Sequence, residues 1–189
     1  MPSFPSPFGG EDGDATFDPA GAFVPAHLPE PGPFLGDHAA LTGEAHLAVH
    51  ATARGVFEER TVYDMTFGYN LARLNRDTRH PDAGYRYAEA TEATLRAEFT
   101  PTTPFCPQSE TLTVGSFRAW NGLADRHAYD LVRVRVHPMH HRADRINDRL
   151  ADLEARFRET GEVAPAGEGP ETAPAGQPGS AADGTDAPL

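Results

Sequence analysis

Apolar and polar residues alternate with a period of two in three stretches of the chain, which predicts three half-buried β-strands. The first stretch covers residues 61–74, and the second covers residues 85–99 with an irregularity inside it. The third covers residues 129–136, where valines occupy the inward positions. Arg133 and Arg135 occupy the alternate positions of this third strand, so we expect both side chains to lie in solvent.

A helical period is clearest near the C-terminus. Four apolar residues recur there on one side of a helix: Ile146, Leu150, Leu153 and Phe157. The positions between them are rich in arginine and acidic residues, so this segment is predicted to form an amphipathic helix. Gly161 is expected to end it, because glycine readily adopts the left-handed conformation that follows many helices.

Two further helices are expected earlier in the chain. One covers residues 38–54, with Asp37 as its N-terminal cap and Gly55 as its stop. The other begins with Ser109 as its cap and ends near Gly122. The order is then helix, strand, strand, helix, strand, helix. This order predicts an α+β fold: a compact two-layer domain with a small three-stranded sheet and about three helices.

Proline, glycine and acidic residues are concentrated at both ends of the chain, which divides it into three parts. Residues 1–37 are expected to form a Pro/Gly-rich acidic disordered arm. Residues 38–160 form the predicted α+β domain, and residues 161–189 a disordered acidic tail. The chain has 16 basic residues, all of them arginine, against 28 acidic residues, and the excess of acid lies in the two ends. No basic stripe is present, so we expect no binding of nucleic acid.

The chain contains one cysteine, Cys106, so it cannot form an internal disulfide bond. No apolar run is long enough for a membrane helix, and the N-terminus lacks the pattern of a signal peptide. We therefore expect a cytoplasmic protein in a reducing compartment, without membrane contact.

Cys106 lies in a proline-rich turn between a predicted strand and a predicted helix, in the stretch TPTTPFCPQSE. Two interpretations remain open from chemistry alone. The thiol is either a small buried apolar group or a reactive centre whose thiolate is favoured by the N-terminus of the following helix. The prolines at positions 101, 104 and 107 stiffen the turn in both cases.

Polar residues that could assist the thiol lie in two other segments. His137, His140 and His141 follow the third predicted strand, and histidines at this spacing can bind metal or can simply be exposed. The turns after the second and third strands could lie at one end of the sheet, which would bring a histidine close to Cys106. Asp64 and Asn70 lie in the first predicted strand.

Three stretches resemble one protein family, in the same order along the chain. EFTPTTPFC, VYDMTFGYNLARL and PMHHRADRINDRLADLE are similar to the cysteine loop, the first strand and the final loop and helix of an iron–sulfur cluster assembly domain family. That family includes SufT-like and PaaD-like bacterial proteins and eukaryotic factors that target clusters to cytosolic and nuclear apoproteins. The chain resembles a divergent member, because Thr66 stands where the family usually has glycine.

The resemblance implies a functional thiol at Cys106, which would be a transient ligand of iron or of a cluster. It implies a supporting loop around that thiol, formed by Thr100, Pro101, Thr103 and Pro104. His140, Asp64 and Asn70 take auxiliary positions in the same comparison. The implied cofactor is a transient iron–sulfur cluster or iron.

The implied function is a protein–protein one, the delivery of clusters or iron to client apoproteins, and not turnover of a small substrate. One thiolate per chain supplies too few ligands for a cluster, so ligation needs a homodimer, the cysteines of a partner (a client apoprotein or another cluster-assembly protein), glutathione-like thiols or His140. Two alternatives remain. The chain could be an accessory maturation subunit for one multicomponent oxygenase, as PaaD-like proteins are, or a non-catalytic interaction domain with a buried structural cysteine.

Overall fold

The computed structural model describes residues 16–165, and they form an α+β domain, as the sequence predicts. The bounds of the three α-helices are α1 Gly43–Glu59, α2 Ser109–Gly122 and α3 Ala143–Thr160. The bounds of the strands are β1 Tyr63–Asp64, β2 Tyr69–Asn70, β3 Gly84–Thr91, β4 Thr94–Thr100 and β5 Leu131–Val136. Short 3₁₀ helices complete the list: η1 Pro25–His27, η2 Leu71–Arg76 and η3 Ala124–Arg126.

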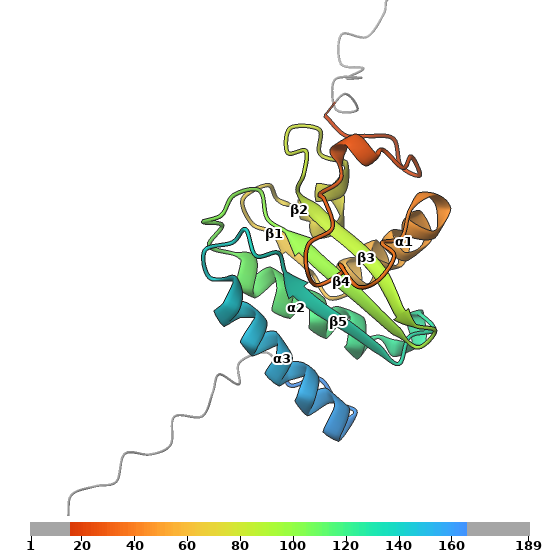
Figure 1. The fold of residues 1–189 in the computed structure, drawn as a ribbon, viewed down its shortest axis with the longest axis vertical. Helices are drawn as coiled ribbons and strands as arrows, with labels where there is room; N and C mark the ends of the chain where they lie inside the picture. Colours follow the sequence, from red (N-terminus) through yellow and green to blue (C-terminus); the bar gives the residue numbers. More distant parts are fainter. Residues whose placement is uncertain (1–15, 166–189) are drawn as a thin grey trace, which may run out of the picture.

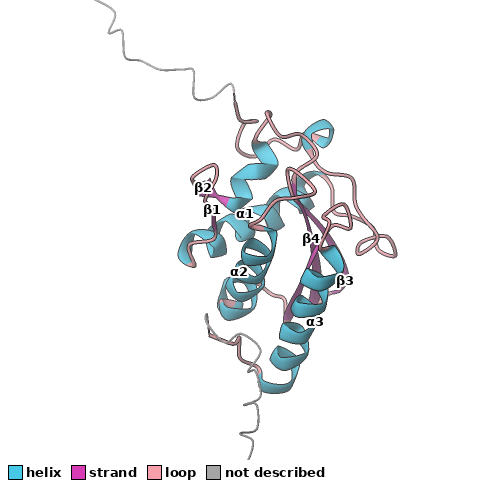
Figure 2. Ribbon diagram, turned by 90° about the vertical axis from the view of Figure 1, so that its left-hand side faces the viewer, coloured by secondary structure: helices cyan, strands magenta, loops and turns pink. Residues whose placement is uncertain are grey.

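The main sheet has the order β3–β4–β5 (Figure 1). β3 and β4 form an antiparallel hairpin, in which Tyr85 pairs with Phe99. β4 and β5 are parallel, in register from Thr94–Leu131 to Phe99–Val136, and α2 makes the crossover between them. Figure 2 shows α1 and α2 on one side of this sheet, while α3 lies along the outer strand β5.

The helix side of the sheet holds the apolar core. Its strand residues are at most 1% exposed: Tyr85, Tyr87, Leu95, Ala97, Phe99, Val132, Val134 and Val136. Phe57 of α1 and Trp120 of α2 are fully buried in the same core. The predicted apolar stripe of α3 also joins it, from Ile146 to Leu153. Burial of each large apolar side chain stabilises the fold by about 1.5–3 kcal/mol.

The first predicted strand, residues 61–74, is wrong. Only the two-residue strands β1 and β2 form there, as a small antiparallel pair, and η2 follows. The reason lies in two side chains that bond to local backbone. Asp64 accepts hydrogen bonds from the N–H groups of Thr66 and Phe67, and Asn70 accepts one from Ala72. Such bonds stabilise turns in competition with a strand ladder.

The second predicted strand, residues 85–99, is instead the β3–β4 hairpin, because the chain reverses between Thr91 and Thr94. The irregularity seen in the alternation is this reversal. Tyr85 and Leu95 nevertheless face the same core, as expected, because the turn preserves the alternation on both sides.

Three predicted helix boundaries are also wrong. α1 begins after Thr42, not after Asp37, and it continues through Gly55 to Glu59. The helix continues because Val56 and Phe57 extend its buried side, and because Gly55 lies in open space. The cap of α2 is Gln108, and Ser109 is its first residue. Gly161 does end α3, with a φ of 71° in the left-handed region, as predicted.

The other side of the sheet is charged and covered. Arg133 and Arg135 do not lie in solvent as expected; Arg135 is 9% exposed, and both guanidinium groups pair with Glu154 of α3 at 2.9 and 2.8 Å. On β4, Glu98 is 1% exposed. The alternation therefore identified the apolar side correctly and the environment of the polar side wrongly, because both sides of this sheet are covered.

The cover is an N-terminal strap, which we define as residues 28–36. The backbone N–H groups of Gly32 and Phe34 donate to the carboxylate of Glu98, and Arg96 donates to the carbonyl of Phe34 at 2.8 Å. Leu35 is fully buried. Figure 1 shows this part of the chain crossing in front of β3 and β4.

The strap corrects the predicted organisation of the N-terminus. Residues 1–37 were expected to form a disordered arm, but residues 16–37 pack on the domain, and the bridge between Phe17 and Asp77 anchors their start. The physical reason is that the charged side of the sheet needs backbone partners, which the strap supplies. Residues 1–15 of the arm and 166–189 of the tail lie outside the described residues. Within residues 16–165, no helix combines the length and apolar character needed to cross a membrane.

Candidate functional site

Cys106 lies in the loop that connects β4 to α2, two residues before Gln108, the cap of that helix. The loop is closed by local backbone bonds: Cys106 N–H donates to Thr103 at 3.3 Å, and the carbonyl of Cys106 accepts from Ser109 at 3.4 Å. The Cys106 side chain is half-buried, as a free thiol. It is therefore neither a fully buried core group nor a fully exposed one.

The supporting loop predicted from the resemblance has a graded exposure. Thr100 ends β4 and is buried, and Pro101 after it is buried as well. Thr103 and Pro104 are exposed. The first half of the loop thus anchors it in the domain, and the second half presents the residues around the thiol at the surface.

The histidine loop after β5 meets the cysteine loop, as the sequence suggested. Both loops follow parallel neighbouring strands, so they start at the same end of the sheet. His141 bonds to the carbonyl of Pro104 through its N–H at 2.9 Å and through its Nδ1 at 2.8 Å. His140 Nε2 donates to the carbonyl of Cys106 at 3.0 Å. The histidines therefore contact the backbone of the cysteine loop.

The ring of His140 has no nitrogen left for a metal. His140 is 4% exposed, its Nδ1 accepts the N–H of Arg142 at 3.1 Å, and its Nε2 is bonded to the Cys106 carbonyl. These two contacts fit the tautomer with hydrogen on Nε2. In this arrangement His140 holds the loop in place. The exposed His141 uses only Nδ1 within the described part of the chain, so Nε2 is the nitrogen that can accept a further bond.

Asp64 and Asn70 bond to nearby backbone and to α1, and neither has a hydrogen bond to residues 100–107. Asp64 caps the turn after β1, while Asn70 caps η2 and donates to Glu58 of α1 at 3.1 Å. The turn that Asp64 caps does reach the start of α2, because Gln108 bonds to Met65 at 2.9 Å and to Thr66 at 2.7 Å. Three loops thus meet around the N-terminus of α2.

Two large apolar side chains are exposed around this point. Met65 is 82% exposed and Phe105 71%, and no other large apolar residue among positions 16–165 is exposed. Phe105 precedes Cys106 and stacks obliquely against His141, with 5.1 Å between ring centroids. Met65 lies on the loop that Gln108 holds. Exposed apolar side chains that gather in one place are typical of protein–protein contacts.

The donor set of this site is small. Among residues 16–165, no group of three or more histidine, cysteine, aspartate or glutamate side chains is arranged to hold a metal ion. The donors that the loops offer are the Cys106 thiol and the Nε2 atoms of His137 and His141, which have no hydrogen-bond partner among residues 16–165. The arrangement can present one sulfur donor, Cys106, to a second molecule.

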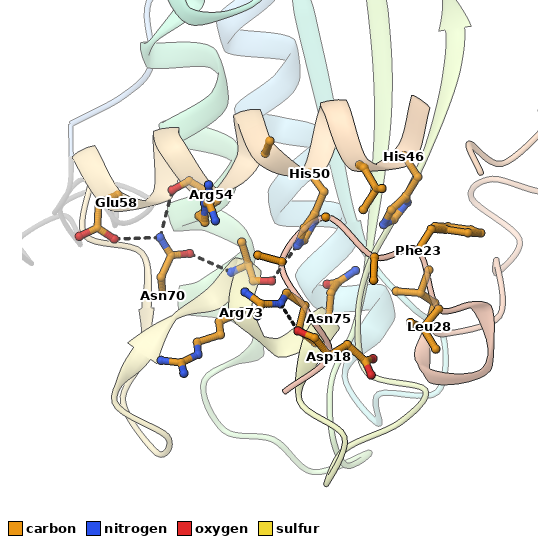
Figure 3. Close-up of a pocket in the computed structure, with 18 residues that line it drawn as sticks. Asp18, Phe23, Leu28, His46, His50, Arg54, Glu58, Asn70, Arg73 and Asn75 are labelled. Carbon is orange, nitrogen blue, oxygen red and sulfur yellow. Dashed lines mark hydrogen bonds between the residues drawn. The ribbon is translucent and has the colours of Figure 1, made fainter. Parts of the chain in front are cut away.

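A second feature of the structure was missed by the sequence reasoning. His46 and His50 lie four residues apart on α1 and line a pocket beneath that helix (Figure 3). Burial lowers the pKa of His46 to about 3 and that of His50 to about 4, so both rings are neutral near pH 7. Their spacing was the available signal, because residues four apart share one side of a helix.

The fold and the cysteine site define the class first: a small α+β domain that presents a single thiol from a strand-to-helix loop. Sequence comparison then identifies the family. Residues 15–164 match the family described as a domain of unknown function, DUF7998, and the chain belongs to that family. No curated protein and no solved structure matches the chain. The family description states no activity, so the resemblance to iron–sulfur cluster assembly proteins stays a prediction.

Proposed function

We propose that the protein is a cytoplasmic iron–sulfur cluster assembly or targeting factor that helps to deliver clusters or iron to client apoproteins through Cys106. The observation that carries the proposal is the position of the thiol. Cys106 is half-buried and lies two residues before the cap of α2; the exposed Phe105 precedes it, and Gln108 holds the turn that carries the exposed Met65. A thiol in this position is accessible to a partner that covers the apolar surface.

The small donor set supports a shared ligation rather than a resident cluster. Cys106 contributes one thiolate, and in the histidine loop the Nε2 atoms of His137 and His141 are not engaged within the described residues. Iron–sulfur clusters are commonly held by four ligands, so the others must come from a second molecule. Delivery then is a ligand exchange: a client thiolate replaces Cys106 at iron, the Cys106 thiolate leaves, and no electron is transferred.

The apolar residues support a protein partner. Phe105 has most of its ring in solvent, although the loop that carries it is fixed by His140 and His141. A fixed apolar side chain loses little conformational entropy when a partner covers it, which favours binding at that point. A client or another cluster-assembly protein that covers Phe105 would also exclude water from the thiol.

The test is anaerobic reconstitution of the full chain with ferrous iron and sulfide, alone and with an apo-ferredoxin as client. We expect the wild-type protein to accelerate formation of holo-ferredoxin, measured by absorption and metal analysis, and Cys106→Ala to abolish this effect. Phe105→Ser should lower the rate while the thiol stays reactive. Arg145→Gln, on the exposed side of α3, is the matched control and should transfer at the wild-type rate.

One result would overturn the proposal: Cys106→Ala that accelerates holo-ferredoxin formation as well as the wild type. Thiol labelling of the native protein provides the independent check. A functional thiol should react at a rate comparable to that in the unfolded chain, whereas a structural cysteine should react only after unfolding.

A further inference from the structure

A pocket of about 460 Å³ lies beneath α1, away from the cysteine loop. Its roof is α1, and its other walls are the N-terminal segment around residues 18–28 and the segment around η2. Figure 3 shows that His46, Phe23 and Leu28 lie at one end, and Arg54, Asn70 and Glu58 at the other. The volume is in the range that accommodates a small organic molecule.

The apolar end contains an unsatisfied polar atom. His46 is 2% exposed, and its Nδ1 is buried without a hydrogen-bond partner. Its neighbour His50 differs, because Nδ1 bonds to Tyr87 at 2.9 Å and Nε2 to the carbonyl of Ala72 at 2.7 Å. A buried polar atom without a partner is unfavourable by about 1–3 kcal/mol, so His46 is an attachment point that the protein itself does not use.

The other end contains an unused positive charge. Arg54 is exposed, and its guanidinium makes no ion pair or hydrogen bond with residues 16–165. The carboxylates of the wall are already engaged: Glu58 accepts from Tyr63 at 2.7 Å, and Asp18 bonds to His27 at 2.7 Å. Three arginines and two carboxylates line the pocket, so with neutral histidines one positive charge is left over.

The two ends are separated by a distance that a ring system can span. His46 and Arg54 are eight positions apart on α1, which corresponds to about 12 Å along the axis. Phe23 and Leu28 provide apolar surface beside His46, and Phe23 lies edge-on to the His46 ring with 5.3 Å between centroids. The wall therefore offers an apolar surface and a hydrogen-bonding nitrogen at one end and a cation at the other.

We infer that this pocket binds a small organic monoanion, with an apolar ring body against Phe23 and Leu28, a hydroxyl or N–H group at His46 Nδ1 and a carboxylate at Arg54. One negative charge matches the single unbalanced positive charge of the wall, which favours a carboxylate over a phosphate dianion. The inference does not depend on the proposed role of Cys106, because none of these residues lies in the cysteine loop.

The probe is 6-hydroxy-2-naphthoate, whose hydroxyl and carboxylate lie at opposite ends of a rigid apolar ring system. Binding to the full-length protein is measured by calorimetry and by the NMR signals of the histidine rings. We expect the probe to shift the His46 signals. The corresponding amide, which lacks the charge, should bind about tenfold more weakly, and 2-naphthoate, which lacks the hydroxyl, about fivefold more weakly.

Three variants locate the site. Ala51→Phe adds a ring at an exposed α1 position that lines the pocket, so it should abolish binding without loss of the fold. Arg54→Gln should bind the acid about tenfold more weakly and leave the affinity for the amide unchanged. Arg145→Gln is the control and should bind as the wild type does. Absence of probe binding, or equal affinity in Ala51→Phe and the wild type, would overturn the inference.

Discussion

The two sides of the β3–β4–β5 sheet are buried by different means. The helix side holds only apolar or aromatic inward positions, from Tyr85 to Val136, packed against α1 and α2. The strap side holds Glu98, Arg96, Arg133 and Arg135, covered by residues 28–36 and by Glu154. The sheet is therefore buried on both sides. Apolar packing buries the helix side, whereas hydrogen bonds and ion pairs hold the charged residues of the strap side.

The two layers differ in how strictly they constrain the positions of their side chains. Apolar packing tolerates substitutions that conserve volume, because it does not depend on bond direction. The charged layer depends on a few contacts, because buried charges are stable only when paired and hydrogen-bonded. Gly32 illustrates this: a Cβ atom there would lie 2.5 Å from the His137 ring and 2.7 Å from the Glu98 carboxylate. Only glycine permits the strap to approach Glu98 closely enough.

The strap also places an aromatic ring among cations. Phe34 lies 5.1 Å from the guanidinium of Arg96, 5.5 Å from that of Arg133 and 5.3 Å from that of Arg135. The face of an aromatic ring attracts cations, so one ring partly compensates three positive charges. Glu154 provides the negative charge at the outer end, where Arg158 also pairs with it at 2.9 Å.

The largest expected effect comes from Glu154→Gln. This change leaves Arg133 and Arg135 without their counterion in a buried layer, so we expect a loss of about 3 kcal/mol in the free energy of unfolding, measured with urea. Val134→Ala, on the same strand but facing the helices, is the matched control. Its loss should not depend on salt, whereas the difference between Glu154→Gln and the wild type should shrink as salt rises.

A triple variant then separates ion pairing from burial. Glu154→Leu combined with Arg133→Met and Arg135→Met replaces all three buried charges by apolar groups and should recover most of the stability that Glu154→Gln loses. If Glu154→Gln were as stable as the wild type, the charged layer would have no energetic role and the comparison of the two sides would fail.

An intermediate effect is expected from the pH, through the histidines at the edge of the apolar side. The pKa of His46 is lowered to about 3 and that of His50 to about 4, both mainly by burial. The unfolded chain binds protons below about pH 6.5 and the folded chain does not, so stability falls as the pH decreases from that value. Between about pH 7 and about pH 5.5 we expect a loss of about 2 kcal/mol for the two rings together.

The measurement is urea unfolding at each pH. His46→Phe should show about half of the pH dependence, since it removes one of the two rings. Arg145→Gln, on the exposed side of α3, is the control and should show the pH dependence of the wild type. Equal pH dependence in His46→Phe and the wild type would show that the buried ring is not responsible.

The smallest effect is expected from Phe34→Ala in the strap. Loss of the ring removes three cation–π contacts, for which we expect about 1 kcal/mol. The effect should be local. Amide hydrogen exchange should therefore accelerate at positions 32 and 34, whose backbone N–H groups donate to Glu98, and stay unchanged at Tyr87. Acceleration at Tyr87 to the same degree would show that the strap and the core open together. Phe34→Leu keeps apolar area without a ring face, so its stability should lie between that of the wild type and that of Phe34→Ala.

Much of the architecture could be predicted because periodicity reports which side of an element is buried. The α3 stripe from Ile146 to Leu153 and the inward valines of β5 were identified in this way. Turns formed by hydrogen bonds between a side chain and nearby backbone were harder to recognise in the sequence. Asp64 and Asn70 look like strand residues in the alternation, but each bonds to nearby backbone and forms a turn instead.

The candidate site could be predicted in part. Parallel strands bring the loops after β4 and β5 to one end of the sheet, and the structure does place His140 against the Cys106 loop. The bond goes to a backbone carbonyl, however, and both nitrogens of His140 are engaged. Contacts of this kind depend on the exact course of two loops, which residue types alone do not specify.

The sequence by itself determined the α+β class, the apolar side of the sheet and the position of a single thiol in a proline-rich strand-to-helix loop, since these follow from local period and composition. Tertiary structure alone decided what covers Arg133 and Arg135, which residues line the pocket under α1 and which atoms His140 contacts. The physical reason is that apolar burial follows from the pattern within one segment. Charge burial instead requires a partner from a distant segment, here the strap and Glu154.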